Sequence, residues 1–257
     1  MLEIGKIQKN IPVAKTIYEM TLYVPEIAKK AKPGQFVNLR LSGKLDPLMR
    51  RPISLHAINP EQGIIKMLYM VVGKGTTMMS EMEEGETIDV LGPLGNGWNL
   101  EMDGKYAVVI GGGIGIAPLY PLVKALREAG KQVEVIMGAK NEAYLTDEKI
   151  YTDTGATVTV TTDDGSAGTK GFVTTALVQS IQAGKCDYIY ACGPKPMLRF
   201  VEKTALDNHV KGQVSTESHM GCGLGVCLLC PTKVKAGGYK RVCTDGPVFA
   251  IGELDYE

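Results

Sequence analysis

The stretch Tyr106-Ala-Val-Val-Ile-Gly-Gly-Gly-Ile-Gly-Ile-Ala-Pro118 decides the fold of the central part of this 257-residue chain. Residues 106–110 form an unbroken apolar run, and the glycines after it lead into a helix-like segment that reaches about residue 129. A buried strand that turns directly into a helix is typical of a parallel sheet covered by helices on both faces. The sequence therefore predicts an α/β unit here.

The glycine-rich turn in this stretch is also a candidate nucleotide site. Glycines let the backbone approach a pyrophosphate closely, and the amino end of a helix favours its negative charge. The turn departs from the GxGxxG pattern, because Pro118 replaces the usual helical continuation. Tight packing of the strand against the helix would also account for the glycines.

Alternating strands and helices continue to about residue 213. Strands are expected at residues 133–138, 157–161 and 187–191, and helices at 174–182 and 196–206. Cys192 follows the last of these strands, at the sheet edge where open α/β sheets bind ligands, although a small buried residue would also suit that place. We predict an α/β nucleotide-binding domain over residues 101–213. Residues 139–142 carry no arginine cluster for a ribose phosphate, which favours NADH, and the turn at residues 163–165 is expected to be solvated or to border the nucleotide.

The first hundred residues follow a different rhythm. Short β-prone runs occur at residues 16–24, 35–41, 64–72 and 86–91, separated by Pro and Gly pairs, and the start of the chain also alternates like a strand. Several short strands punctuated by turns are typical of an antiparallel barrel or sandwich. We predict an antiparallel β-barrel domain over residues 1–100, and therefore a multi-domain α+β protein.

Four of the six cysteines crowd into the last part of the chain with the spacing Cys222-x4-Cys227-x2-Cys230-x12-Cys243. This spacing is the plant-type [2Fe–2S] pattern. Nearby glycines allow the backbone to wrap closely around such a cluster. We predict a small [2Fe–2S] domain over residues 214–257, ordered by its cluster.

The same four cysteines could instead bind zinc or form disulfides. Structural zinc also takes four thiolates, but zinc sites usually pair their ligands as two CxxC units and this chain has one. Two disulfides are disfavoured because the start of the chain lacks the apolar core of a signal peptide, which leads us to expect a cytoplasmic, reducing location.

Two segments of the first domain are candidates for binding a phosphate or a ring. Arg51-Pro52-Ile53-Ser54 places a guanidinium next to a hydroxyl at the start of a strand. Gly75 and Thr76 open a short helix whose unpaired amides favour phosphate. Each segment could equally be ordinary structure, a surface charge at Arg51 and a helix cap at Thr76.

Composition excludes two classes of function. The 28 basic and 28 acidic residues cancel, so nothing drives non-specific binding to nucleic acid. The longest uncharged stretch, residues 107–123, contains four glycines and two prolines, which argues against a membrane span.

The order of these motifs resembles the ferredoxin–NADP reductase family over nearly the whole chain. The shared features are Arg-Pro-x-Ser, Gly-x-Gly-Thr, the glycine-rich turn, Cys-Gly-Pro and the terminal cysteines. Within that family, the run from Glu217 to Cys227 and the closing residues 242–249 resemble the electron-transfer subunits of NAD-dependent dihydroorotate dehydrogenases. Many family members carry Tyr where Ile53 stands, which is a departure at the expected flavin contact.

The resemblance implies FAD, a [2Fe–2S] cluster and NAD(H) as substrate. It places the nicotinamide beside Gly113, Gly115 and Cys192, and the cluster on Cys222, Cys227, Cys230 and Cys243. It implies that FAD contacts Arg51, Pro52, Ile53, Ser54, Leu68, Tyr69, Met70, Gly75 and Thr76.

These groups suggest one path for electrons, because a flavin converts between two-electron and one-electron transfer. With these groups, the path runs from NADH through FAD and the cluster to an acceptor outside the chain. No catalytic residue for a small ring substrate is expected, and His56, His209 and His219 are interpreted as ordinary residues. The resemblance implies an FMN-bearing catalytic subunit that converts dihydroorotate to orotate in pyrimidine biosynthesis, two of each subunit, and electrons flowing toward NAD.

Two rival functions stay open. One is a small FAD and [2Fe–2S] subunit of another NAD(P)H-dependent enzyme, of the ferredoxin:NADP, sulfide dehydrogenase or hydrogenase type. The other is a zinc-stabilised, non-enzymatic nucleotide-binding module. Nucleotide preference, cluster potential, partner identity and direction of flux are not fixed by the sequence.

Overall fold

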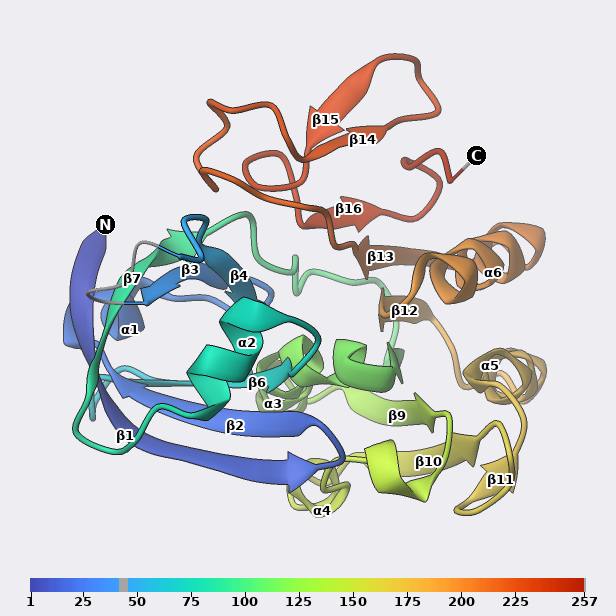
Figure 1. Cartoon of the computed structure of the whole chain (residues 1–257). Coiled ribbons are helices and arrows are strands. Elements are labelled where there is room, and N and C mark those ends of the chain that lie inside the picture. Colours follow the sequence, from blue (N-terminus) through green and yellow to red (C-terminus); the bar gives the residue numbers. More distant parts are fainter. Residues whose placement is uncertain (42–45, 257) are drawn as a thin grey trace.

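A computed structural model describes residues 1–41 and 46–256 of the chain. The N-terminal half forms one antiparallel sheet in the order β4-β3-β7-β1-β2-β6-β5 (Figure 1). Its strands are β1 (Leu2–Ala14), β2 (Ile17–Tyr23), β3 (Phe36–Leu41), β4 (Arg51–Ser54), β5 (Ala57–Asn59), β6 (Ile64–Met70) and β7 (Thr87–Leu94). The four strands expected from β-prone runs are all present, with ends shifted by at most three residues.

The two ends of this sheet are joined by the chain itself. The last strand in the order, β5, follows β4 directly, and two residues link them. The Leu55 amide donates to Gln35 O at 3.0 Å, and the His56 amide donates to Lys66 O at 2.8 Å. The chain therefore crosses from the β3 side of the sheet to the β6 side, around a core that includes Val37, Met67 and Val90.

Two short helices accompany the sheet. They are α1 (Pro25–Lys30) and α2 (Lys74–Ser80). The second begins where the sequence predicts a helix start. Within it, Thr76 Oγ1 accepts from the Val72 amide at 3.0 Å and from the Gly73 amide at 3.2 Å, so the hydroxyl caps its own helix.

The central sheet has the order β11-β10-β9-β8-β12-β13-β16. Its parallel strands are β8 (Tyr106–Gly112), β9 (Gln132–Ala139), β10 (Thr157–Thr162), β11 (Thr169–Lys170), β12 (Tyr188–Cys192) and β13 (Lys211–Ser215). The expected strands match β8, β9, β10 and β12. Strand β13 was not predicted, because its sequence Lys-Gly-Gln-Val-Ser lacks an apolar run.

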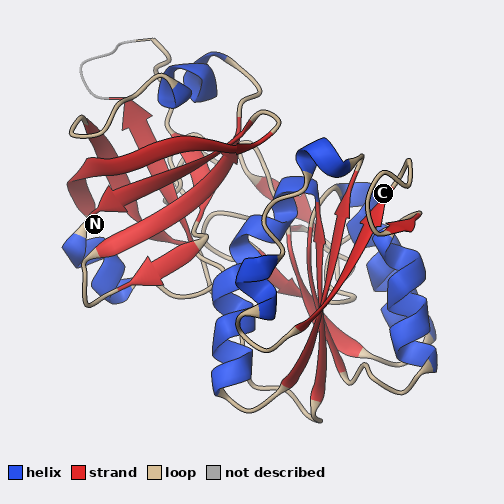
Figure 2. Cartoon of the chain, turned by 90° about the horizontal axis from the view of Figure 1, so that it is seen from below, coloured by secondary structure: helices blue, strands red, loops and turns tan. Residues whose placement is uncertain are grey.

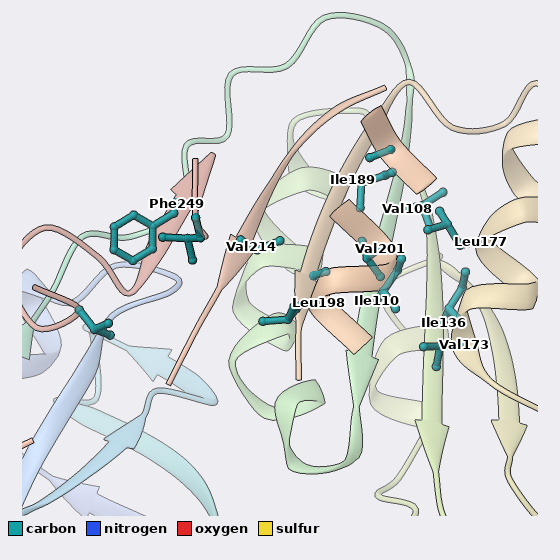
Figure 3. Packing of buried hydrophobic residues seen from close by; sticks show 14 of the residues in the cluster. Val108, Ile110, Ile136, Val173, Leu177, Ile189, Leu198, Val201, Val214 and Phe249 are labelled. Atoms are coloured by element: carbon teal, nitrogen blue, oxygen red, sulfur yellow. The ribbon is translucent and has the colours of Figure 1, made fainter. Parts of the chain in front are cut away.

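Helices cover both faces of this sheet (Figure 2). One face packs against α3 (Tyr120–Glu128) and α4 (Lys149–Thr152), through Leu122 and Tyr151. The other packs against α5 (Val173–Gln182) and α6 (Lys195–Asp207), where Leu177 and Leu198 meet the strands (Figure 3). Between β8 and α3 the glycine-rich turn continues as a 3-10 helix, Gly113–Leu119.

The C-terminal segment is built onto the central sheet. Strands β14 (Pro231–Lys233) and β15 (Tyr239–Arg241) form a hairpin, whereas β16 (Val248–Ala250) pairs antiparallel with β13. Phe249 of β16 belongs to the same apolar cluster as Val214 (Figure 3). The sheet is thus mixed rather than wholly parallel, and the predicted boundary between residues 213 and 214 falls inside β13. The hairpin and β16 are regular structure that the sequence pattern did not reveal.

Candidate functional site

A large pocket of about 950 Å³ lies at the carboxyl ends of the central strands. The chain runs from β8 outward to β10 and later returns to β12 on the other side of β8, so the strand order reverses between β8 and β12. Open α/β sheets bind ligands at this kind of reversal. Gly112 and Gly193, at the ends of these two strands, both line the pocket.

The pocket is completed by the N-terminal sheet. Ile17 and Met70, from β2 and β6, line it together with Ile114 of the glycine-rich turn. Ile17, Leu68 and Ala117 form a small buried cluster at the same junction. The proposed flavin segment and the proposed nucleotide turn are therefore in direct contact, although some forty residues separate them in the sequence.

His56 is a second link between the sheet and this turn. Its ring Nδ1 lies 2.8 Å from Ala117 O and therefore carries the proton of that hydrogen bond. Burial lowers the pKa of His56, while the bond to Ala117 opposes that shift. We expected an ordinary histidine, and in the structure its hydrogen bond joins the sheet to the glycine-rich turn.

Residues 111–118, the nucleotide loop, approach β12 very closely at Gly115. A β-carbon on Gly115 would lie 2.5 Å from the carbonyl oxygen of Cys192, too close for any side chain. The Cys192 thiol is buried, and burial raises its pKa to about 12. Gly113 and Gly115 line the pocket, whereas Cys192 lies behind it rather than on its surface.

The far end of the pocket contains residues that we did not select from the sequence. Asp163 follows β10, at the turn predicted either to be solvated or to border the nucleotide, and it lines the pocket. Phe172 and Phe200 also line it, with 66% and 49% of their surfaces exposed. Exposed aromatic rings beside a pocket are suited to stacking on a flat base. Because these residues lie far apart in the sequence, the sequence does not reveal that they line one pocket.

Glu217 reaches the pocket from the segment after β13. Desolvation raises the pKa of its carboxyl group. It lies near Cys192, whose thiolate it disfavours electrostatically. The sequence marks Glu217 only as the start of a motif, whereas in the structure it lines the cavity.

The candidate flavin residues are divided by the structure. Arg51 packs on Gly75, where a β-carbon would collide with its guanidinium, and the guanidinium donates to Met49 O. This contact unites the two segments expected to bind phosphate. Tyr69 instead points into the core of the sheet, where its hydroxyl donates to Asn10 Oδ1 at 2.9 Å. Leu68 and Met70 face the nucleotide loop.

Residues 221–230, the cysteine loop, carry three of the last four cysteines, and together with Cys243 these form two pairs. In the first pair, the Cys222 amide donates to Cys227 Sγ and the Cys227 amide to Cys222 Sγ, each at 3.4 Å. Burial opposes ionisation of Cys222, but amides of the loop, including that of Leu224, lower its pKa. In the second pair, burial and the adjacent Cys230 raise the pKa of Cys243.

All six cysteines are free thiols. Among residues 1–41 and 46–256, no three His, Cys, Asp or Glu side chains converge as the ligands of a single metal ion would. Two pairs of thiols fit a two-iron cluster, in which each iron takes two thiolates, better than one four-coordinate zinc ion. The loop amides aimed at Cys222 and Cys227 suit the same cluster, because they would donate to its sulfur ligands.

Apolar side chains around the cysteine loop face solvent. Leu224, Val226, Leu228 and Leu229 expose 54%, 79%, 66% and 50% of their surfaces. These side chains therefore do not form a dry shell over the cysteines. An exposed apolar patch of this kind marks an interaction site more often than a bare surface.

In the described part of the chain, no helix has the length and apolar character needed to cross a membrane.

The fold defines the class of protein. A solved ferredoxin reductase from carbazole 1,9a-dioxygenase has the same fold, with a TM-score of 0.69 at 19% identity, and the match covers 82% of this chain and 66% of that one. A family model described as the oxidoreductase NAD-binding domain matches residues 109–203. The chain therefore shares the fold of this reductase, and its central part matches an oxidoreductase NAD-binding domain.

Closer comparisons identify the family. The model described as the iron-sulfur cluster binding domain of dihydroorotate dehydrogenase B matches residues 217–255. The electron transfer subunit of dihydroorotate dehydrogenase B (NAD(+)) from Geobacillus sp. (strain WCH70) is 43% identical over 250 residues, covering 96% of this chain and 95% of that protein. The subunit of the same name from Desulforamulus reducens is 39% identical over 248 residues and covers 95% of each. The chain belongs to the family of dihydroorotate dehydrogenase B electron transfer subunits.

One solved structure resembles the chain over its whole length. It is an NADH-dependent reduced ferredoxin-NADP oxidoreductase, studied for flavin-based electron bifurcation. Its TM-score is 0.90 at 36% identity, and the match covers 99% of this chain and 90% of that one. This likeness bears on the choice of partner below.

Proposed function

We propose that the chain passes electrons between NAD(H), FAD and a [2Fe–2S] cluster, and exchanges them with the FMN-containing catalytic subunit of a dihydroorotate dehydrogenase. It would thereby support the conversion of dihydroorotate to orotate in pyrimidine biosynthesis. The observation that carries this proposal is the position of the N-terminal sheet. One part of it touches the nucleotide loop through Leu68, and another part lies against the cysteine loop, where Asn38 of β3 meets Gly223.

In this proposal the pocket holds the nicotinamide nucleotide. Gly113 and Gly115 leave room for it, while Phe172 and Phe200 stack on its adenine. The Asp163 carboxylate accepts from the ribose hydroxyls and repels a 2′-phosphate, which favours NADH over NADPH. FAD, when bound, takes up two electrons together and releases them one at a time.

The remaining residue assignments are proposals of the same kind. Arg51 and Gly75 hold the FAD phosphates, with Pro52, Ile53, Ser54 and the backbone of Leu68–Met70 along the ring, and Thr76 beside the phosphates. Cys192 supports the nicotinamide from behind. Cys222, Cys227, Cys230 and Cys243 bind the cluster.

We propose domains over residues 1–100, 101–213 and 214–257, the first of them a closed barrel. Closure is supported by the Leu55 and His56 amides, which tie one stretch of chain to both edges of the sheet. The third domain shares its β16 with the central sheet, so we expect it to be fixed to that sheet and not to swing freely.

The exposed apolar residues around the cysteine loop form the proposed docking surface for the catalytic subunit. They surround Cys227, which is itself exposed, so a partner seated there comes close to the cluster. Each chain presents one such surface and would bind one catalytic subunit. We propose two subunits of each kind in the assembly. The free thiols are consistent with the cytoplasmic location that we propose.

The test is a reconstitution with the purified chain and a dihydroorotate dehydrogenase B catalytic subunit. NAD-dependent oxidation of dihydroorotate should need both proteins, and the purified chain should contain FAD, iron and acid-labile sulfide. A rate no higher than that of the catalytic subunit alone would refute the partner. A colourless protein with zinc and no flavin would refute the electron-transfer function altogether.

A second candidate is favoured by the likeness to the NADH-dependent reduced ferredoxin-NADP oxidoreductase. For this candidate the cofactors are the same, but the partner is a subunit that reacts with NADP(H) and reduced ferredoxin. The same preparation decides between the two. Complex formation and NAD reduction with such a subunit, but not with the dihydroorotate dehydrogenase subunit, would establish the second candidate.

A further inference from the structure

Asn38 is a buried amide that lacks any partner for its side chain. It lies in β3 with no exposed surface, and neither Oδ1 nor Nδ2 makes a hydrogen bond within the described part of the chain. Burying an amide without partners is unfavourable, so such groups in folded proteins are usually satisfied by a ligand or by water. The side chain is therefore placed to meet a group that binds to the protein.

The surroundings of Asn38 narrow the choice of that group. Asn38 is paired across the sheet with Pro52 of the proposed flavin strand, so the two side chains share one face. The neighbours Val37 and Leu39 point to the opposite face, into the core of the sheet. Asn38 thus lies on the outer face, beside the flavin strand.

The cysteine loop covers this face. A β-carbon on Gly223 would lie 3.0 Å from Asn38 Nδ2 and 3.0 Å from Leu94, so the loop rests directly on the amide. Gly223 also has a φ of 71°, a backbone conformation that favours glycine. Gly223 follows Cys222 immediately, so the side-chain amide of Asn38 lies beside the first cysteine pair.

The polar groups nearby are already engaged. Arg50 donates to Asn38 O and, as a two-pronged pair, to the Asp89 carboxylate at 2.9 Å. The charges of Arg50 and Asp89 are therefore paired with each other, and the neighbouring Leu94 is apolar. The cysteine sulfurs of the loop that covers Asn38, and the cluster that they would hold, are acceptors on this face.

We propose that the Asn38 side-chain amide donates a hydrogen bond to a sulfur of the [2Fe–2S] cluster or of Cys222. A donor at this sulfur stabilises the extra negative charge of the reduced cluster and so makes its potential less negative. Asn38 is a positioning residue by this argument: it sets the energy of the electron between flavin and cluster without itself reacting. The inference rests on the proposed function, because it requires the cluster.

The test compares the wild-type chain with Asn38→Leu, which keeps the volume of the side chain but removes both polar atoms. A reductive titration followed by the electron paramagnetic resonance signal of the reduced cluster should give a more negative midpoint for Asn38→Leu. The matched control is Thr21→Val, since Thr21 also buries an unpaired hydroxyl but lies on β2, three strands from β3 in the sheet. Its midpoint should equal that of the wild type.

A second measurement uses only the wild-type chain, so it does not depend on whether a variant folds. With asparagine labelled by ¹⁵N, the wild-type reduced cluster should show a hyperfine coupling to nitrogen that is absent from a chain labelled on glutamine. An unchanged midpoint in a fully loaded Asn38→Leu chain, or the lack of this coupling, would overturn the inference. Iron and acid-labile sulfide are measured first. A wild-type chain without them refutes the proposed function. A wild-type chain that contains them, with no effect of the Asn38 substitution, refutes only this inference.

Discussion

The nucleotide loop and the cysteine loop are both glycine-rich and both lie against the N-terminal sheet, yet they are held in place differently. The nucleotide loop follows a strand in the middle of a seven-stranded sheet, and Ile116, Ala117 and Leu119 of its helical turn are buried. The cysteine loop has no regular structure, and most of its apolar side chains face solvent. The first loop is shaped by the core beneath it, whereas we expect the second to be ordered by its cluster and by its partner.

This contrast indicates that the two loops are held in their conformations by different interactions. Burial of apolar surface fixes the nucleotide loop before any ligand binds, so substitutions there should alter affinity and leave the fold intact. Ligation is expected to fix the cysteine loop, as it does in other small metal-binding segments with little core of their own. Five changes test this contrast, and they are ordered from the largest expected effect to the smallest.

Cys227→Ala should have the largest effect. It removes one thiol of the first pair, so iron and acid-labile sulfide should fall to near zero and electron transfer to the partner should be lost. FAD content and the unfolding of the central domain should stay close to wild type, because neither depends on the loop. Cys186→Ala, on a free thiol that lies outside both loops, is the control and should keep the full cluster. Wild-type iron in Cys227→Ala would show that the ligand set is wrong.

Gly115→Ala tests the nucleotide loop. The added β-carbon would lie 2.5 Å from Cys192 O, a backbone atom that cannot move aside as a side chain can. Strain of about 1–3 kcal/mol corresponds to a loss of roughly 5- to 150-fold in kcat/KM for NADH. Steady-state reduction of ferricyanide by NADH measures it, with cluster content as the check that the other loop is unaffected. A wild-type kcat/KM would mean that the loop is far more pliable than its buried turn indicates.

How far the sequence predicts these two loops also differs. The strand and turn at Tyr106–Pro118 were recognisable because an apolar run and a glycine series are local signals. The spacing of the cysteines predicted their cluster for the same reason. Neither signal reveals that β16 pairs with β13, because that contact joins segments more than thirty residues apart, and each has only a few apolar residues.

The residues missed in the site share this cause. Phe172 and Phe200 belong to different helical units and meet only at the pocket. Asn38 stands in the run Phe-Val-Asn-Leu-Arg-Leu, where an alternating polar residue on a β-strand is unremarkable. Its lack of a partner becomes visible only when the cysteine loop is seen to cover it. Long-range packing, which has no local pattern, accounts for what the sequence did not show.

Val226→Asp tests the exposure of the cysteine loop. Val226 has 79% of its surface exposed, so the charge should not disturb the fold but should weaken docking of the catalytic subunit. A loss of about 1–2 kcal/mol would raise the Kd for the subunit by roughly 5- to 30-fold. Calorimetry of complex formation measures it. Leu2→Asp, at an apolar position on β1 with 61% of its surface exposed, is the control, and an equal loss there would remove the case for a docking surface.

Lys235→Met tests the tie between the C-terminal segment and the central domain. The Lys235 ammonium pairs with the Glu202 carboxylate, whose side chain is only 3% exposed, on α6. Removing the ammonium leaves a buried carboxylate without its counter-charge, but half of the lysine side chain is exposed, so we expect a loss of about 1–2 kcal/mol rather than the full cost of an isolated buried charge. Urea unfolding measures it. Lys211→Met, which breaks the exposed pair with Asp103, should change stability by less than about 0.5 kcal/mol. Equal losses in the two variants would mean that the buried pair contributes nothing of its own.

The smallest effect should come from the pH dependence of His56, the link between the sheet and the nucleotide loop. Burial lowers its pKa below 6.5, so the unfolded chain takes up a proton before the folded one does. Its contribution to stability is therefore complete above pH 6.5 and is lost as the pH falls from there toward the lower pKa of the folded state. Urea unfolding at pH 8 and pH 5.5 should show a loss in the wild type that is smaller in His56→Gln, which keeps a polar side chain but cannot titrate. The apparent KM for NADH should not follow this loss, because protonation at Nε2 leaves the Nδ1–H bond to Ala117 O in place. Identical pH profiles of unfolding for the two proteins would show that titration of His56 contributes nothing to stability, and that the apolar contacts of Leu68 and Ile17 hold the nucleotide loop to the sheet at either pH.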